Sequence, residues 1–569
     1  MDRRTFTKYS ALTVLGQATL PGFAKYFNER TLSVPELLGW LIQLNDQSIP
    51  SLLGRQEINS NHPWFGGIEN EYQIYTPQDT TFFIQTLACS LVTPYSEYYQ
   101  SENLINRLEI GITYLLKAQH VDGTIDLLST NFHSTPDTGF IVKRLSPVYV
   151  LLKKTDWPKL TPVQEKLQTF LLRAGEALCK GGIHTPNHRW VVSAALAWLN
   201  HLFPAERYVD RIDQWLNEGI DIDPDGQFHE KSTYIYSPLS DRTLITIARL
   251  LARPELLAPV RKNLEMTLYY IHPNGEIVTE ASGRQDQYQV GYLEHYYYPY
   301  RYMATKDNHP EFAAACHLIE EMRLPALTQY LNYLLEDSGL WDNFPQPGNL
   351  PVDYIKPFPH SGLIRIRRDQ IDATIISNNP TFLTLHKGQA ILQAVRLATA
   401  FFGKGQFSTE TIEEKGSRFV LQQRLEGPYY QPYPVEELLK DRDWDKMPRS
   451  NRPQSEIQEL ETTVVIIEEK GSFQLIIDIK GTENVPVAVE LAFRHGGTLS
   501  NVSTVEDIPS AFILKSGYGQ YRMDDDVITF GPGHAEHTWS QLRGALPKLD
   551  AQCVYLTGFT PFYQVFEFS

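Results

Sequence analysis

Two short motifs about 40 residues apart carry the side chains best suited to chemistry. Residues 185–190 read TPNHRW, and residues 225–236 read DGQFHEKSTYIY. Together they offer an amide, an imidazole, a guanidinium and two phenols at or near predicted helix starts. Such a set suits the removal of a proton next to a carboxylate, because donors stabilise the developing anion while an imidazole or phenol moves the proton.

In the first motif, Asn187 and His188 lie where a helix is predicted to begin. The helix N-terminus, the Asn187 amide and the Arg189 guanidinium would then form a local site for an anion. A capping asparagine beside a packed histidine is the simpler alternative. Trp190, on the same helix, is a candidate sugar contact, and packing in the core is the alternative.

In the second motif, Glu230 precedes two tyrosines, Tyr234 and Tyr236. If the segment is helical, Glu230 and Tyr234 share one face, and the carboxylate can orient a phenol. Both tyrosines are therefore candidate proton carriers, and simple capping by Glu230 is the alternative. Asp241 and Arg242, just beyond, are expected to be a surface or interhelix salt-bridge pair.

A third polar loop, residues 283–288, reads GRQDQY. Arg284 is the natural second cation for a uronate, and Tyr288 is a candidate substrate contact. The aromatic run that follows, residues 292–300, either lines a sugar groove or packs one helix against its neighbours.

Length and charge narrow the class of protein. A chain of 569 residues is too long for one ordinary core, so two or more domains are expected. The formal net charge of −16 argues against a nucleic-acid partner, although an acidic surface can hold a local basic cleft for an anionic polysaccharide. The four cysteines are widely spaced, without a CxxC pattern, and are expected to be free thiols.

The N-terminus indicates export. Residues 2–8 read DRRTFTK and precede a modestly apolar stretch. This pattern resembles a twin-arginine signal, which we assign to residues 1–30, so a periplasmic or secreted protein is expected. An amphipathic first helix of a cytosolic protein is the alternative. No segment predicts a membrane span.

Apolar residues at three- and four-residue spacing predict a succession of amphipathic helices between about residues 33 and 335. The clearest are 104–119, 163–180, 187–202, 238–251, 257–271, 311–322 and 326–335. Many such helices, joined by loops of varied length, suggest an (α/α) toroid over residues 33–338.

A Pro/Gly-rich linker over residues 339–360 follows, and then the pattern changes to period two. This predicts strands at 363–367, 371–376, 464–467, 473–479, 485–493 and 553–557. The sequence thus predicts an α+β multidomain chain, with an antiparallel β-sandwich over residues 361–569 after the toroid. Residues 428–453 are expected to be an inserted loop, and a cleft between the two domains is the expected site.

With these residues in view, the chain resembles the heparinase II/III-like polysaccharide lyases over most of its length. The resemblance rests on the helical region, the linker, the β region, the Asn-His pair and the later DG…E…Y segment. It implies β-elimination of uronic-acid-containing polysaccharides. By the family's pattern, Asn187 and His188 would contact the uronate carboxylate, with His188 also a candidate base. Tyr236, or Tyr234 in reserve, would be the acid or both acid and base, and His386 would reach the cleft from the sandwich.

One departure concerns zinc. Many of these lyases carry a His-x-His-x-Asp-like strand that builds a zinc site, whereas residues 386–389 here read HKGQ. Zinc is therefore not supported by the sequence, and no cofactor is expected. The HAEH stretch at 534–537 is common in spacing and is expected to be structural.

Two other functions compete. A glycoside hydrolase on the same helical framework would use Asp225 and Glu230 as its two carboxylates, but it leaves the phenols and the Asn-His pair unexplained. A non-catalytic glycan-binding protein would keep the aromatic residues without the chemistry. The identity of the polysaccharide, syn or anti elimination and the oligomeric state stay open.

Overall fold

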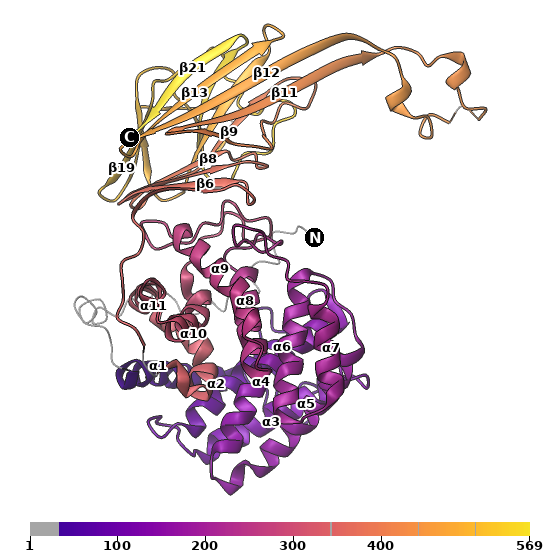
Figure 1. Cartoon of the computed structure of the whole chain (residues 1–569), viewed down its shortest axis with the longest axis vertical. Coiled ribbons are helices and arrows are strands. Elements are labelled where there is room, and N and C mark those ends of the chain that lie inside the picture. Colours follow the sequence, from indigo (N-terminus) through magenta and orange to yellow (C-terminus); the bar gives the residue numbers. More distant parts are fainter. Residues whose placement is uncertain (1–33, 342–343, 442, 507) are drawn as a thin grey trace. The chain divides into compact units, whose positions relative to one another are not determined.

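The computed structural model describes residues 34–341, 344–441, 443–506 and 508–569. The chain divides into two compact units (Figure 1). The helical unit comprises the described residues up to 271 and residues 275–350, and the sheet unit comprises residues 272–274 and 351–569. The short segment His272–Asn274 therefore belongs to the sheet unit although helices precede it in the sequence.

The helical unit contains an α-helix at each predicted position except 326–335, where only the second half is α-helical. Its α-helices are α1 (Val34–Gly54), α2 (Pro77–Val92), α3 (Glu102–Ala118), α4 (Thr135–Lys154), α5 (Thr161–Lys180), α6 (Pro186–Leu202), α7 (Glu206–Leu216), α8 (Tyr236–Leu250), α9 (Leu257–Thr267), α10 (Tyr297–Asp307), α11 (Pro310–Arg323) and α12 (Leu331–Glu336). Two short strand pairs accompany them, β1–β2 (Ile68–Glu69, Tyr75–Thr76) and β3–β4 (Ile125–Leu127, Asn131–Ser134).

The structure differs from the prediction where periodicity is weak. Helix α4 was not predicted because most of its residues are buried, so it shows no regular polar face. The predicted helix at 326–335 is a 3-10 turn, Leu324–Tyr330, followed by α12.

The segment before α8 is a turn rather than the helix considered above, and α8 begins only at Tyr236. Lys231 has a φ of +47°, which a right-handed helix does not accommodate. The Ser232 hydroxyl accepts a hydrogen bond from the Tyr236 backbone N–H at 3.1 Å. Glu230 and Tyr234 are therefore not placed by helical periodicity.

The sheet unit contains two large sheets. One follows the order β16-β17-β20-β14-β9-β8-β7-β6-β5, the other β10-β11-β12-β13-β21-β19-β18-β15, and neighbours are antiparallel except β17 and β20. In the first sheet the bounds are β5 (Asp353–Phe358), β6 (Leu363–Arg368), β7 (Ile371–Ile376), β8 (Leu383–Lys387), β9 (Ala390–Thr399), β14 (Pro486–Phe493), β16 (Ser503–Thr504), β17 (Ala511–Ile513) and β20 (Gln552–Phe559). In the second they are β10 (Glu413–Lys415), β11 (Arg418–Tyr430), β12 (Gln454–Glu469), β13 (Ser472–Gly481), β15 (Thr498–Ser500), β18 (Gly519–Met523), β19 (Asp526–Gly531) and β21 (Phe562–Phe568).

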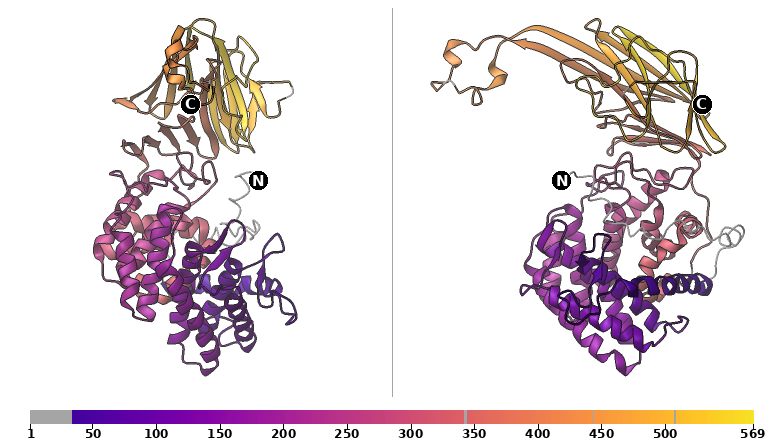
Figure 2. Two further views of the ribbon diagram at one scale, coloured as in Figure 1. Left: turned by 90° about the vertical axis from the view of Figure 1, so that its right-hand side faces the viewer. Right: turned by 180° about the vertical axis from the view of Figure 1, so that it is seen from behind.

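Alternation along the strands explains how the two sheets share one core. In β12 and β13 the apolar members Val464, Ile466, Leu475 and Ile477 are fully buried, and they join apolar side chains of β7, β9 and β14 in one cluster. The predicted strands are confirmed. The inserted loop lies at the end of the long β11–β12 hairpin, which extends well beyond the sheet (Figure 2).

The cysteines, the possible membrane spans and the N-terminus were also subjects of prediction. All four cysteines are free, as expected, and Cys89, Cys316 and Cys553 are buried. In the described part of the chain, no helix combines the length and apolar character needed to cross a membrane. The export signal assigned to residues 1–30 lies outside the described residues.

Candidate active site

Three segments of the helical unit form the candidate site: the start of α6, the turn before α8, and the loop 278–291. The Asn187 amide nitrogen donates to both oxygens of Glu230, at 2.9 and 2.8 Å, which joins the first two segments. The Gly283 N–H donates to the Lys231 carbonyl at 2.8 Å, which joins the third. Asp286, fully buried, accepts from the Tyr234 N–H at 3.1 Å. Hydrogen bonds therefore assemble the site from residues far apart in the sequence.

Asn187 is held firmly rather than used as a cap. Thr185 is the N-cap of α6, and Asn187 is the second helical residue, 2% exposed. Its amide hydrogens go to Glu230 and to the Thr185 hydroxyl at 3.1 Å, whereas its carbonyl oxygen accepts no hydrogen bond. Glu230 thus fixes the orientation of the amide, because the flipped amide would set an oxygen against a carboxylate.

His188, half-buried beside Asn187, is a neutral imidazole at neutral pH. Burial lowers the pKa of His188 to about 4, and the neighbouring His184 and the Arg284 guanidinium act in the same direction. The edge of the Phe140 ring packs against it, with ring centroids 6.2 Å apart, and its Nδ1 makes no hydrogen bond. A neutral ring with a free nitrogen can accept a proton or take part in a hydrogen bond with an oxyanion.

Tyr236 is the better placed of the two tyrosines. Its phenol oxygen accepts a hydrogen bond from the Gln285 amide nitrogen, and the Arg284 guanidinium lies over its ring, 5.5 Å from the centroid. An amide donor and a guanidinium therefore lie beside this phenol. Tyr236 also stands at the first position of α8.

Tyr234, unlike Tyr236, lies beside a carboxylate. Its hydroxyl donates to Glu294 at 3.1 Å, and its ring packs on His295 at 4.9 Å. Burial and the Glu294 carboxylate raise the pKa of Tyr234 well above its ordinary value. It is therefore a poor proton acceptor, which supports the choice of Tyr236.

Two predicted substrate contacts have structural roles instead. The Arg189 guanidinium is 9% exposed and donates to Asp221 at 2.9 Å, to Glu218 at 3.2 Å and to the Gly219 carbonyl at 3.1 Å. Trp190 is fully buried and donates to Asp221 at 2.9 Å. Both side chains hold α6 to the loop 218–221, so neither is available to a substrate.

Arg284, by contrast, is exposed, and in the described chain it forms no ion pair with a carboxylate. Tyr288 lies in the same loop with a left-handed backbone, φ +62°, and is half-buried. The aromatic run that follows belongs largely to the core: Tyr296, Tyr297, Tyr298 and Tyr300 are at most 1% exposed. The packing alternative is correct for these four.

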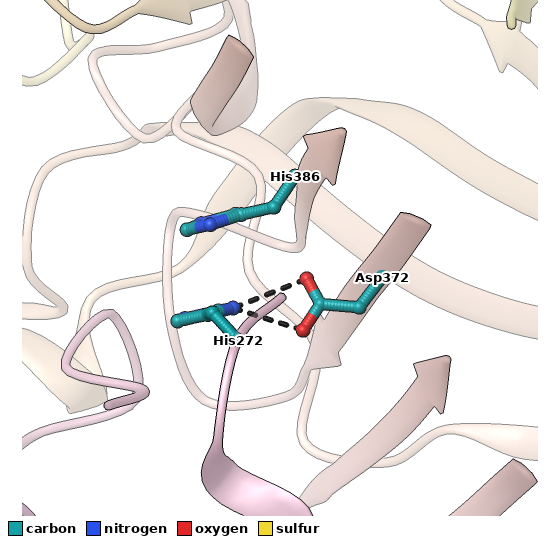
Figure 3. A group of neighbouring side chains, drawn as sticks. All are labelled: His272, Asp372 and His386. Atoms are coloured by element: carbon teal, nitrogen blue, oxygen red, sulfur yellow. Dashed lines mark hydrogen bonds and ion pairs between the residues drawn. The ribbon is translucent and has the colours of Figure 1, made fainter. Parts of the chain in front are cut away.

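His386, the predicted catalytic histidine of the β region, belongs to a buried cluster of the sheet unit (Figure 3). Asp372 on β7 pairs with His386 on β8 in the strand register, and His272 reaches both from the segment His272–Asn274. The two imidazole rings stack with centroids 3.6 Å apart, and His272 Nδ1 lies 2.9 and 3.1 Å from the Asp372 oxygens. Sequence reasoning missed His272 and Asp372, which no spacing links to His386.

This cluster has the donor chemistry of a zinc site. Two imidazoles and one carboxylate offer ligand atoms within 4.8 Å of one another, and all three residues are buried. The fully buried Arg365 donates to Asp372, an outer partner of the kind that orients a ligating carboxylate. Burial alone would raise the pKa of Asp372, but Arg365 and His272 hold it well below its usual range, so the carboxylate is ionised. The residues present fit zinc, in a set different from the strand motif that the sequence lacks.

The other histidine pair is structural in character. His534 contacts Glu536 at 2.8 Å, and His537 Nε2 contacts the Gly558 carbonyl at 3.0 Å. These partners anchor the loop at 534–537 to itself and to β20.

Comparisons with known proteins identify solved structures of similar fold, but they find no match among family models or curated proteins. No protein-family model matches the sequence, and no curated protein does. Heparinase III is similar in structure with a TM-score of 0.55 and 12% identity, over 96% of this chain and 86% of that one. The chondroitin AC lyase of Streptomyces coelicolor A3 gives 0.52 and 12%, over 95% and 80%. The xanthan lyase of Paenibacillus gives 0.57 and 9%, over 95% of this chain and 57% of that one. This chain therefore has the polysaccharide lyase fold of helices followed by large antiparallel sheets.

Proposed function

We propose that the protein is a polysaccharide lyase that cleaves uronic-acid-containing polysaccharides by β-elimination. The single observation that carries the proposal is the environment of Tyr236, whose phenol oxygen accepts a hydrogen bond from Gln285 beside the exposed guanidinium of Arg284. Neutral His188 lies within the electrostatic reach of the same guanidinium. The shared fold with heparinase III and chondroitin AC lyase adds support by analogy. In this proposal the helical unit is an (α/α) toroid and the sheet unit a β-sandwich.

The chemistry follows from the charges. Arg284 pairs with the uronate carboxylate, which makes the C5 proton more acidic and stabilises the enolate-like transition state. The Tyr236 phenolate takes the C5 proton, the C4–O bond breaks, and the same phenol returns the proton to the leaving oxygen. A C4–C5 double bond forms and no water is consumed.

His188 and Asn187 complete the carboxylate site. The neutral His188 ring hydrogen-bonds the carboxylate or, in an anti elimination, replaces Tyr236 as the base. Asn187, fixed by Glu230, positions the start of α6 beside the bound carboxylate. His386 stays a candidate for the reaction, and parallel activity and zinc measurements on His386→Gln separate a role in catalysis from a role as ligand.

A zinc ion held by His272, Asp372 and His386 would tie the segment His272–Asn274 to strands β7 and β8 and would serve as a structural element. We also propose export through the twin-arginine-like residues 1–30. Fractionation of cells that express the full chain and an Arg3→Lys/Arg4→Lys variant tests this, since the variant should stay in the cytoplasm.

The function is tested by ultraviolet absorbance of the unsaturated uronate on hyaluronan, chondroitins, heparan, alginate and gellan-type polymers. A rise with the wild type, lost in Arg284→Met but kept in Arg173→Met, supports the lyase. Arg173 lies on α5 and is exposed, so it controls for the loss of one surface guanidinium. New reducing ends without absorbance would replace the lyase by a hydrolase, and binding without either product would indicate a glycan-binding protein.

A further inference from the structure

One loop of the candidate site carries both groups that lie beside the Tyr236 phenol. Arg284 lies over the Tyr236 ring, Gln285 donates to the phenol oxygen, and the two residues are consecutive in the sequence. The loop 278–291 that carries them contains neither a helix nor a strand. Its position beside the phenol therefore depends on contacts with other segments.

Asp286, the next residue of this loop, joins it to the turn before α8. The side chain is fully buried, and a single carboxylate oxygen, Oδ2, accepts from the Tyr234 backbone N–H and from the Ser282 hydroxyl, each at 3.1 Å. Burial raises the pKa of the Asp286 carboxyl, and both hydrogen bonds oppose this shift. One oxygen atom thus holds a residue of the turn and a residue of the loop together.

The same turn contacts the loop at two further points. The Gly283 N–H donates to the Lys231 carbonyl at 2.8 Å, immediately before Arg284. Farther along the loop, the Tyr234 ring lies so close to Gly291 that an added Cβ atom there would be 2.6 Å from the ring. The turn therefore contacts the loop on both sides of its two functional residues.

Asp286 differs from Asp241, the buried carboxyl of α8. The salt bridge expected between Asp241 and Arg242 does not form, because the Arg242 guanidinium lies over the Tyr330 ring, 5.1 Å from its centroid. Asp241 is fully buried, and neither of its oxygens makes a hydrogen bond. A carboxyl without a bonded neighbour does not orient a loop, so Asp241 provides a matched control for the loss of a buried carboxyl.

We propose that Asp286 is a positioning residue, which holds its loop to the turn before α8 and so sets Arg284 and Gln285 against the phenol. The inference rests on the proposed function for the reaction, but the position of the loop can be measured without turnover. It also separates the two tyrosines: the phenol of Tyr236 takes part in the proposed chemistry, whereas Tyr234 contributes its backbone N–H and the face of its ring.

Two substitutions of Asp286 distinguish positioning from a general loss of structure. Asp286→Asn keeps the shape and one acceptor oxygen, so kcat should stay within about fivefold of the wild type, as it should in Asp241→Ala. Asp286→Ala removes the acceptor and should lower kcat about 100-fold, because a misplacement of about 1 Å near the reacting groups has an effect of that size. The assay is ultraviolet absorbance of the unsaturated uronate, with thermal unfolding to show that each variant is folded.

A double-mutant cycle tests whether the loss passes through the loop. In a Gln285→Met background the amide donor to the phenol is already absent, so Asp286→Ala should lower kcat by about tenfold or less instead of about 100-fold. The same factor in both backgrounds would show that Asp286 acts on the fold as a whole, and would overturn the proposal.

Gly291→Ala displaces the loop without altering Asp286. Its Cβ atom would meet the Tyr234 ring, whereas the Cβ atom of Gly182→Ala, in the loop before α6, would meet no atom within 4 Å. Gly291→Ala should therefore lower kcat by about tenfold or more, and Gly182→Ala should not. This pair decides the question if Asp286→Ala folds poorly, and wild-type kcat in Gly291→Ala would then refute the positioning role.

Hydrogen exchange measures the loop in the absence of substrate. Asp286→Ala should speed amide exchange in residues 231–236 and 278–291 by about tenfold or more, and Asp286→Asn should not. Unchanged exchange in Asp286→Ala would overturn the positioning role and leave the lyase proposal standing. Faster exchange in this variant, in a protein whose wild type produces no unsaturated uronate from any polymer, would keep the role of Asp286 in the loop while refuting the lyase.

Discussion

Replacing Tyr236 by phenylalanine tests the proposed chemistry most directly. The substitution keeps the ring beneath Arg284 and removes only the hydroxyl that accepts from Gln285. Loss of one half-buried hydrogen bond lowers the free energy of unfolding by about 1 kcal/mol, so the variant should fold. Removal of a positioned proton carrier lowers kcat by about 10²- to 10⁴-fold. A thousandfold loss corresponds to about 4 kcal/mol in the activation barrier, well above the stability effect.

Tyr234→Phe is the matched control. It removes a hydrogen bond to Glu294, which is buried and lies 3.5 Å from Arg323. Its effect should fall on stability, with kcat changed by less than about tenfold. Both variants are assayed by ultraviolet absorbance on the best polymer, beside thermal unfolding. A Tyr236→Phe enzyme that keeps a tenth or more of wild-type kcat, while Tyr234→Phe loses activity, would refute the reasoning and move the proton carrier to Tyr234.

The remaining predictions concern three other sites. His188 has a pKa lowered to about 4 in the folded protein, so the unfolded chain binds a proton first as pH falls below about 6.5. The neutral His188 ring contributes at most about 3 kcal/mol to the free energy of unfolding, which is present above pH 6.5 and lost towards pH 4. Urea unfolding should therefore show that the stability of His188→Gln falls less steeply over this pH range than that of the wild type. Parallel falls in the two proteins would contradict the assignment. Glu230→Gln should lower kcat/KM about 10- to 100-fold with little change in Tm, because the side-chain shape is kept while the Asn187 amide loses a charged acceptor. A variant with wild-type kcat/KM would show that the orientation of the Asn187 amide is irrelevant. The purified protein should hold about one zinc by elemental analysis, and His272→Ala or Asp372→Ala should lose it; a metal-free wild type whose Tm does not respond to added zinc would exclude the site.

Several helices could be predicted from the sequence, and α3 and α6 begin within two residues of their predicted starts. Helix α4 could not, because burial on nearly all sides removes the period on which such a reading depends. The turn before α8 was taken for a possible helix because nothing in the sequence signals the left-handed Lys231. Local spacing predicted α3 and α5, which keep an exposed face, and also α6, which is mostly buried, but it missed α7.

The residues of the candidate site were also predicted only in part. Motif reasoning singled out Asn187, His188 and Tyr236 as candidates, and the structure places them at the starts of α6 and α8. It misassigned Arg189, because the carboxylates that bind it come from a loop about 30 residues away. His272 escaped notice for a related reason, since its partners lie 100 or more residues away on β7 and β8. Roles that depend on partners distant in sequence need the fold.

The bond between Asn187 and Glu230 has a consequence for recombination of such chains. It joins two segments 43 residues apart, and the loop 278–291 is bonded to the second of them. A chimera that exchanges only one of these segments pairs an amide with a side chain that did not evolve beside it. The three segments therefore depend on one another, and substrate preference should transfer between related chains only when all three segments are exchanged together.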